Sequence, residues 1–535
     1  MLHRKAGSAL AVAAAFVAAG LTAQAQAQEA KKDADTADSR LEKLLKGFYG
    51  TLDVSIDDVT KGMDGMVAYH LTTDAQGNPI LDYAHPKSGG AGPVGRVGYM
   101  PALSSNKSNL GYRGEHKVGG SDLAVIYQIE VSLALVATPG LRTSYTQQGN
   151  TVTGTVGSGD TFVGLKGSWG TLKAGVTYAP YKKSTDRMNP FSGMLGDYAV
   201  VMGNTGGDNR VEFGTRLDHS LWYESPRYEG FSYDVLVSPG QNRTYDNVVQ
   251  SAGSPDCNGG NAPGSGNLLL NCDDGGFDNA FSLALKYETK NLYVTAAYEL
   301  HKNVNRNSDG IGSNNPYYGV DQSTLNLAYS TYIPSQFTGV APDGTPFTGP
   351  QVGNWLGSPP YLNDIGDEAA AKVGVQYIFD ATGTTVSAIF EHMTRKLPAN
   401  LAFQNERQRN GTWLAASQAV GGDGTVSLGW AHAGKTPGDP GGQHNYNPAA
   451  TNNTANMFTV AYKQKLDKQL AWYVNFAETI NTANAHYDLG AGGRGLTTDC
   501  HDGTNFVYVD YSSAGPTTWG GCKPRGVTVG INYKF

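Results

Sequence analysis

Runs of about ten residues in which apolar or aromatic side chains alternate with small or polar ones recur along the whole chain. Two of them are 292–300 (LYVTAAYEL) and 526–535 (GVTVGINYKF). After residue 27, no apolar run approaches the ~20 residues that a membrane-spanning helix needs. A period of two is instead the pattern of a β-strand with one apolar and one polar face. The sequence therefore predicts an all-β protein, and it excludes a helical inner-membrane protein.

Sixteen such runs are present, and the connections between them alternate in length. The predicted strands are 47–57, 108–116, 122–133, 161–168, 171–178, 217–225, 231–238, 280–288, 292–300, 370–379, 383–392, 411–419, 424–432, 455–464, 470–479 and 526–535. Short turns such as TKN, DATG and GGDG alternate with segments of roughly 20 to 70 residues. Bacterial outer-membrane barrels have this asymmetry, with short periplasmic turns and long extracellular loops. A solenoid or propeller would show a fixed repeat, which is absent from this sequence.

The alternation also predicts which side chains face lipid. In the last run, Val527, Val529 and Ile531 share one face, whereas Thr528 and Asn532 share the other. The first face suits hydrocarbon and the second suits a polar lumen. The sheet must then close into a 16-stranded antiparallel transmembrane β-barrel, because an open edge in hydrocarbon leaves backbone groups unpaired at a cost of several kcal/mol each.

The N-terminus predicts export. Residues 1–27 have a basic start (His3, Arg4, Lys5), an apolar stretch and an A-x-A site ending at Ala27, and so read as a cleaved signal peptide. Residues 28–46 are expected to be a short periplasmic extension with a brief amphipathic helix, and residues 47–535 to form the barrel. No break in composition divides this last part into further domains.

Composition and motifs argue against other classes of protein. The net charge of -7 offers no basic surface for nucleic acid. The chain has no HExxH, P-loop or G-x-S-x-G motif, and the G-x-G-x-x-G at 490–495 neither follows a strand nor opens a helix. His219 and Ser220 are adjacent on one predicted strand, so their side chains point to opposite faces and cannot share a catalytic site. We expect neither an enzyme nor a cofactor.

Four stretches carry a resemblance to a known family: 108–130 (SNLGYRGEHKVGGSDLAVIYQIE), 162–181 (FVGLKGSWGTLKAGVTYAPY), 220–235 (SLWYESPRYEGFSYDV) and 529–535 (VGINYKF). They are similar to the general porins of Gram-negative outer membranes, especially the beta-proteobacterial type. The resemblance implies a homotrimer among outer-membrane lipids that lets ions and small hydrophilic solutes diffuse passively. It also implies that the terminal Phe535 is read by the barrel assembly machinery.

In the resembled family the third loop folds into the lumen and narrows it. The corresponding segment here is 179–215, followed by Arg216, while Trp222 replaces a second arginine of the family pattern. We expect bases on the wall to face acids on the loop and to set the ion preference, whose sign stays open. The candidate constriction and lumen residues are Arg113, Glu115, Glu130, Lys166, Lys173, Asp186, Arg187, Asp197, Asp208, Arg210, Glu212, Arg216 and Trp222.

The cysteines and the loop lengths add two expectations. Cys257 and Cys272 lie in the fourth long loop, and Cys500 and Cys522 lie in the eighth, so pairing within each loop is expected, although four cysteines allow three connectivities. Neither pair has the C-x-x-C spacing of a metal site. Long loops are usually functional, and those at 58–107, 239–279, 301–369 and 480–525 therefore keep a second class open: a substrate-specific channel or a loop-borne surface binding protein on the same barrel.

Overall fold

The structure is a computed structural model of the 535-residue chain. It describes residues 45–59, 69–73, 79–86, 100–133, 135–136, 138–139, 151–152, 157, 159–202, 213–214, 216–239, 279–305, 337–340, 346–349, 365–396, 407–435, 454–482, 487, 489, 501–502, 517–518 and 523–535. The predicted signal peptide, nearly all of the predicted extension and the four cysteines lie outside these ranges, so those three expectations remain predictions.

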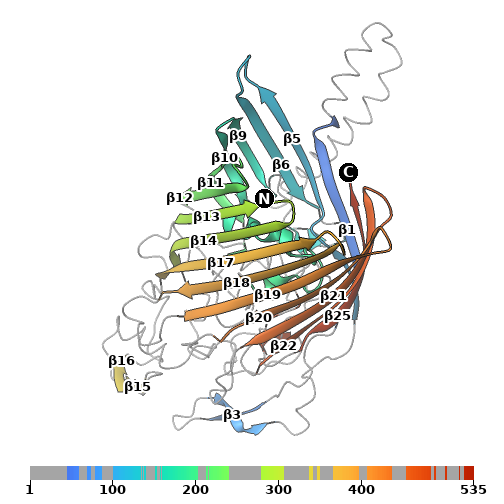
Figure 1. Ribbon diagram of the computed structural model, residues 1–535. Helices are drawn as coiled ribbons and strands as arrows, with labels where there is room; N and C mark the ends of the chain where they lie inside the picture. The colour runs from blue at the N-terminus through green and yellow to red at the C-terminus, as the bar shows by residue number, and fades with distance from the viewer. Residues whose placement is uncertain are drawn as a thin grey trace, which may run out of the picture.

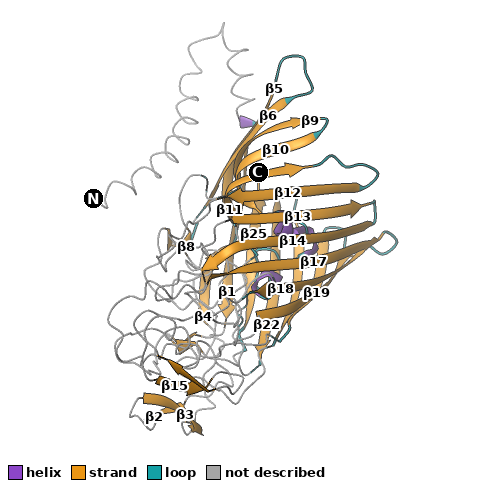
Figure 2. Cartoon of the chain, turned by 90° about the vertical axis from the view of Figure 1, so that its left-hand side faces the viewer, coloured by secondary structure: helices purple, strands orange, loops and turns teal. Residues whose placement is uncertain are grey.

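The main strands form one antiparallel sheet that closes on itself, as Figures 1 and 2 show from two sides. β1 (Phe48–Val59) pairs with β25 (Arg525–Lys534) on one edge and with β4 (Met100–Ser105) and β5 (Asn109–Lys117) on the other. The sheet has 17 strands. β4 and β5 follow each other along the same edge of β1 and so fill one strand position of the wall, which we call a stave. The barrel therefore has sixteen staves. The predicted fold class is confirmed.

The other barrel strands each pair with the next one along the chain. They are β6 (Ala124–Ser132), β9 (Thr161–Gly167), β10 (Gly170–Tyr178), β11 (Arg216–Glu224), β12 (Phe231–Pro239), β13 (Asn279–Glu288), β14 (Leu292–Asn305), β17 (Ile365–Phe379), β18 (Thr384–Arg395), β19 (Arg407–Val420), β20 (Gly424–Ala433), β21 (Ala455–Lys465) and β22 (Leu470–Asn481). Short pairs lie between them: β2 (Tyr69–Thr73) with β3 (Pro79–Pro86), β7 (Thr138–Pro139) with β8 (Thr151–Val152), β15 (Phe337–Val340) with β16 (Pro346–Gly349), and β23 (His501–Asp502) with β24 (Thr517–Thr518).

Every predicted strand is present, and one boundary needs correction. The predicted first loop ends at residue 107, but β4 already belongs to the wall. Lys107, with a φ of 53°, interrupts the stave between β4 and β5. Before this kink the side chains that face outward belong to odd-numbered residues, such as Leu103. After it they belong to even-numbered residues, such as Leu110. Because the alternation changes phase there, a search for a single period of two misses β4.

The two faces of the barrel differ as the alternation predicts. On β25, Val529 and Ile531 are 52% and 49% exposed on the outside, while Thr528 is 1% exposed on the inside. The same strand therefore presents apolar side chains to lipid and polar ones to the lumen. No helix in the described part of the chain is both long and apolar enough to cross a membrane.

The short connections all lie at one end of the barrel. They are residues 118–123, 168–169, 225–230, 289–291, 380–383, 421–423 and 466–469. The two ends of the sheet meet there as well, since the Gly50 amide donates to the Phe535 carbonyl at 3.1 Å. In outer-membrane barrels the end with short turns is the periplasmic one. The long segments therefore emerge on the extracellular side.

Buried carboxylates hold the seam where the first strand meets the last. Asp57 on β1 accepts hydrogen bonds from the hydroxyls of Ser55 and Thr528, both at 2.8 Å, and from Ser104 on β4. Asp53 accepts from Tyr473 on β22, at 2.7 Å. Because β25 and β4 flank β1 on opposite edges, Asp57 links all three strands by side chains as well as by the backbone.

We expect Asp57→Ala to destabilise the barrel, because three buried hydroxyls lose their acceptor, at about 1–3 kcal/mol for each unsatisfied group. The measurement is the urea unfolding midpoint of the refolded protein in detergent, followed by tryptophan fluorescence. Asp58→Ala is the matched control, since Asp58 is the next residue on β1 and is exposed on the outer face. Equal midpoints for the two variants would contradict the assigned role of Asp57.

Candidate pore constriction

The segment after β10 folds into the barrel and lies against the inner wall. It contains α3 (Pro180–Lys183), η3 (Asp186–Met188) and η4 (Tyr198–Val200). Pro180 opens α3, where its fixed φ and missing N–H suit the first helical position. Asp197 caps η4 by accepting from the Ala199 amide at 3.1 Å. We call residues 179–202, the described part of the predicted third loop, the inner loop.

The first half of the inner loop is anchored on β13, β14, β17 and β18. The Tyr181 amide donates to Ser282 Oγ at 3.0 Å, and its hydroxyl donates to Glu391 on β18. Tyr293 Oη donates to the Ser184 carbonyl at 2.8 Å. Lys372 Nζ donates to Thr185 Oγ1 at 2.8 Å. These bonds come from side chains of the barrel wall, so the strands fix the path of the loop.

The second half continues along the wall as far as β22. Trp413 Nε1 on β19 donates to the Met188 carbonyl at 3.1 Å, and Asn475 Nδ2 on β22 donates to the Leu195 carbonyl at 2.7 Å. Arg409, fully buried, donates to the Val201 carbonyl at 2.9 Å. Each donor satisfies a loop carbonyl that would otherwise be buried without a partner.

Apolar packing lies between the loop and this part of the wall. Met188 and Phe191 of the loop pack with Trp413 and Met457 of the wall, and all four are fully buried. The rings of Phe191 and Trp413 meet edge to face, with centroids 5.9 Å apart. Each buried side chain of this size contributes roughly 1.5–3 kcal/mol. The inner loop and this part of the wall therefore share one apolar core.

An ion pair holds the tip of the inner loop to the kink in the second stave. Lys107 Nζ lies 3.5 Å from Asp197 Oδ2 and donates to Ser192 Oγ at 2.7 Å. Burial works against ionisation of Asp197, but Lys107, Lys182 and two backbone amides hold the pKa of this carboxyl below its ordinary value. Because the folded-state pKa lies below the unfolded value of about 3.9, ionised Asp197 stabilises the fold fully above that pH. This stabilisation is lost as the pH falls through the folded-state pKa.

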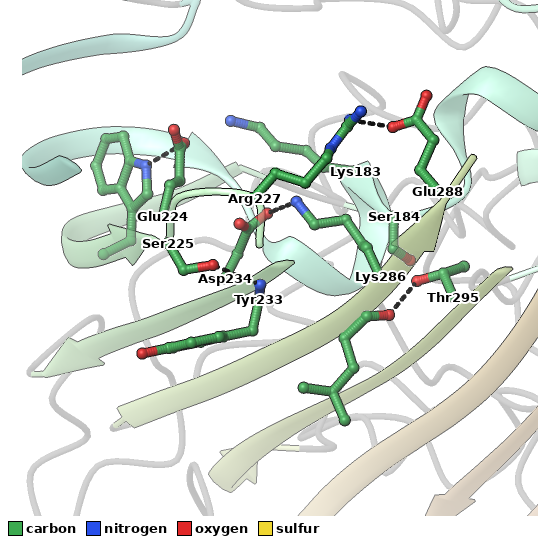
Figure 3. A network of polar contacts seen from close by, with 12 residues as sticks. Lys183, Ser184, Glu224, Ser225, Arg227, Tyr233, Asp234, Lys286, Glu288 and Thr295 are labelled. Atoms are coloured by element: carbon green, nitrogen blue, oxygen red, sulfur yellow. Dashed lines mark hydrogen bonds and ion pairs between the residues drawn. The ribbon is translucent and has the colours of Figure 1, made fainter. Parts of the chain in front are cut away.

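The wall strands from β5 to β13 carry ion pairs that face the lumen. Lys166 lies 2.9 Å from Glu115, and Lys173 lies 2.7 Å from Glu224. Figure 3 shows the neighbouring pair of Lys286 and Asp234, at 2.6 Å, with Arg227 against Glu288 beside it. Lys173 and Glu224 lie on the adjacent strands β10 and β11, and Lys286 and Asp234 lie on β13 and β12, where diagonal pairs of opposite charge stabilise the sheet. Lys166 on β9 instead reaches Glu115 on β5 across β6.

A second cluster lies where the inner loop leaves the wall. Arg216 Nε donates to Asp160 Oδ1 at 2.9 Å, and Lys183 Nζ lies 3.1 Å from Asp160 Oδ2. Arg216 also lies 3.8 Å from Glu130 and covers the Tyr178 ring at 4.1 Å. Two bases from different elements thus converge on one carboxylate.

The geometry differs from one expectation about the candidate residues. Trp222 is 3% exposed, because Phe162 packs edge to face on it and Lys173 and Lys183 lie over it, so it is not a water-facing lumen residue. Of the two loop acids that the structure describes, Asp197 pairs with Lys107 of the wall, whereas Asp186 pairs with Lys182 of the loop itself at 3.4 Å.

The other candidate residues divide into three groups. Arg113, Glu115, Glu130, Lys166, Lys173 and Arg216 lie together on the wall, while Arg187 reaches Glu288 at 2.8 Å and covers the Tyr293 ring. Asp208, Arg210 and Glu212 lie outside the described residues. Sequence reasoning missed Lys107 and Asp160, which are just outside strands, where alternation gives no signal. In the part of the chain that the structure covers, no cluster of His, Cys, Asp or Glu is arranged to hold a metal ion.

A closed sixteen-stave barrel with a loop folded against its inner wall defines a porin-type barrel. The profile of the Gram-negative porin family matches residues 9–484, and the chain belongs to that family. The resemblance predicted from the sequence is thereby confirmed, and membership places the protein in the outer membrane.

Individual relatives are distant. The major outer membrane protein P.IB of Neisseria gonorrhoeae is 27% identical over 156 residues, which cover 28% of this chain and only 38% of that protein. The anion-selective porin from Comamonas acidovorans has a TM-score of 0.51 at 17% identity, covering 91% of this chain and 98% of that one. The trimer form of OmpT from Vibrio cholerae has a TM-score of 0.43 at 10% identity, covering 91% and 98%. The Comamonas likeness supports the fold.

We expect Gly196→Ala to loosen the tip of the inner loop. Gly196 has a φ of +77°, and a Cβ there would lie 2.0 Å from Thr459 Oγ1 on β21. The substitution would strain the backbone and push away the Thr459 hydroxyl, which donates to the Gly196 carbonyl at 3.2 Å. The measurement is the rate of chymotrypsin cleavage after Phe191 and Tyr198, which are buried in the native protein.

Gly214→Ala is the control for this prediction, since no atom lies within 4 Å of a Cβ at that position. The Gly196 variant should be cleaved several times faster than the native protein, and the Gly214 variant at the native rate. Native protection in the Gly196 variant would show that the tip does not depend on this contact.

Proposed function

We propose that the protein forms a water-filled channel for passive diffusion of ions and small hydrophilic solutes across the outer membrane. The observation that carries this proposal is the character of the lumen: the inner loop packs on the wall through apolar clusters, and paired charges line the wall beside it. Charged side chains of this kind remain hydrated in an aqueous path, whereas a sealed barrel interior would require apolar filling. Chemistry on a bound substrate has no support in this arrangement.

The channel is proposed to work as a homotrimer embedded in outer-membrane lipids. Phe535 is proposed as the terminal signal for the barrel assembly machinery, after export directed by residues 1–27. In support of the signal, Phe535 ends β25 at the seam, and its ring stacks at 6.0 Å on the outward-facing Tyr533. We also propose that two disulfides, Cys257–Cys272 and Cys500–Cys522, each close one loop.

We further propose that the channel prefers anions. Several lumen ion pairs expose the base more than the acid: Lys107 is 53% exposed against 9% for Asp197, and Arg216 is 26% exposed against 13% for Glu130. The pairs Lys173–Glu224 and Lys182–Asp186 have the opposite order. An ion passing through meets the exposed partner at shorter range and through less screening, so the exposed partner has the larger effect.

Burial removes more acids than bases from the water-accessible surface. The buried acids among the described lumen residues are Asp53, Asp57, Asp197, Glu299, Glu368 and Glu391. Lys372, Arg409 and His301, which lies between Glu299 and Glu368, are the corresponding buried bases. Arg113 and Lys534, in contrast, are exposed. A chain with a net charge of -7 can therefore present a positive path, and the Comamonas porin, described as anion-selective, is a precedent on the same fold.

The zero-current potential across a planar bilayer with a KCl gradient tests the preference. Anions moving down the gradient should make the dilute side negative. Lys107→Gln should move the potential toward zero, and Asp186→Asn should make it more negative. Each permeability ratio should change a few-fold, since one charge at ~4 Å in a water-like medium is worth ~1 kcal/mol.

Lys290→Gln is the control, because Lys290 is 80% exposed in a periplasmic turn and pairs with Asp380 outside the lumen. A positive dilute side in the native protein would overturn the anion preference. Conductance rising in three equal steps would support the trimer. A silent bilayer, or saturable block by one solute, would favour the substrate-specific or surface-binding alternative.

A further inference from the structure

The outer face of the barrel carries a repeated polar pair that the channel does not use. His392 Nδ1 on β18 lies 2.7 Å from Asn410 Oδ1 on β19, and His432 Nδ1 on β20 lies 2.9 Å from Asn456 Oδ1 on β21. An amide oxygen can only accept, so both imidazoles donate through Nδ1. Trp430 donates to the same Asn456 oxygen at 3.1 Å and stacks on His432. We call these five residues the outer row.

The outer row faces the membrane, close to the extracellular end. Its members are even-numbered on β18 to β21, like Phe390, Leu414 and Phe458, which are exposed on the outside. His392 lies three residues before the end of β18, and Asn456 lies one residue after the start of β21. Both strand ends connect to long segments, so the row is level with the outer leaflet.

An apolar groove of about 450 Å³ begins directly beside the row. Its lining includes Val375, Ala388, Leu414, Ala416, Leu428 and Trp430. The register sets Ala388 beside Leu414 and Ala416 beside Leu428, so two small side chains form a floor between larger ones. Trp413 and Phe191 pack against the inner side of the wall here, at Gly429, so the groove opens to the outside. Trp430 belongs to both the groove and the row.

We propose that this face binds an anionic, phosphate-bearing glycolipid of the outer leaflet, with one acyl chain in the groove and the headgroup on the outer row. The groove lies at hydrocarbon depth, while the row offers imidazole and amide groups and contains no carboxylate. Nearby, Asp367 is already paired with Lys302. Asn410 and Asn456 can donate through Nδ2, and each imidazole donates through Nε2 when it is protonated. Such donors above an apolar slot match a lipid that has phosphate and hydroxyl oxygens above its chains.

A second protein subunit fits this face less well. Ala388 and Ala416 form the floor of a narrow slot. The larger side chains around it, Val375, Leu414 and Leu428, are 42–55% exposed. A stable subunit interface needs roughly 800 Å² per partner of broad, matching surface. A single flexible acyl chain fills such a slot without a matched counterpart. This inference requires only the barrel in its membrane and is independent of the ion preference proposed above.

The test is native mass spectrometry of the purified, delipidated full-length protein, titrated with diphosphoryl lipid A and separately with phosphatidylglycerol of matched chain length. Lipid A should be retained several-fold better than phosphatidylglycerol. The double variant His392→Ala/His432→Ala should lose most of this difference, because the headgroup contacts disappear. The double variant Ala388→Leu/Ala416→Leu should weaken retention of lipid A by filling the groove while leaving the lumen unchanged.

Two outward-facing substitutions elsewhere are matched controls. His116→Ala removes an exposed outward histidine at the periplasmic end of β5, and Ala296→Leu adds bulk at an exposed outward alanine on β14. Both should bind like the native protein, and heat-modified migration on a gel confirms folding of every variant. Equal retention of the two lipids, or equal loss in test and control variants, overturns the proposal. So does a change of oligomeric state confined to the groove variant, which would identify the face as a subunit contact.

Discussion

The structure depends first on the cost of leaving backbone groups unpaired in hydrocarbon. That cost allows a sheet to span the membrane only if its first and last strands meet, which β1 and β25 do. Buried Asp57 reinforces the seam with hydroxyl partners on both flanking strands. Once closure is fixed, the pleat assigns every second side chain to the lumen. The polar wall, the bed of the inner loop and the outer row all follow from that assignment.

The inner loop turns a uniform barrel into one with two different sides. Wall residues such as Trp413, Asn475 and Arg409 donate to loop carbonyls, and the apolar cluster around Phe191 fills the space between. These interactions depend on each other. Without the apolar cluster the loop backbone would be exposed to water, and without the donors of the wall the loop carbonyls would be buried unpaired. The ion pairs of β5 to β13 line the wall beside the loop.

Charge in this lumen is governed by exposure rather than by composition. The chain is acidic overall, yet many of its lumen carboxylates are used structurally, as at the seam and beneath the loop. Lys107 and Arg216 stay in contact with water while their acidic partners are covered. Net charge is therefore a poor guide to ion preference here, since a buried and hydrogen-bonded carboxylate acts on a passing ion less than an exposed base does.

The sequence alone determined the architecture, because a period of two and alternating connection lengths are local properties of the chain. It placed all sixteen strands. The tertiary structure decided what local patterns cannot encode. The phase change at Lys107 hid β4, packing by Phe162 buried Trp222, and the partners of Asp186 and Asp197 depended on the path of the inner loop. Alternation determines the face of the sheet on which a side chain lies, whereas its partners and its exposure depend on segments far away in sequence.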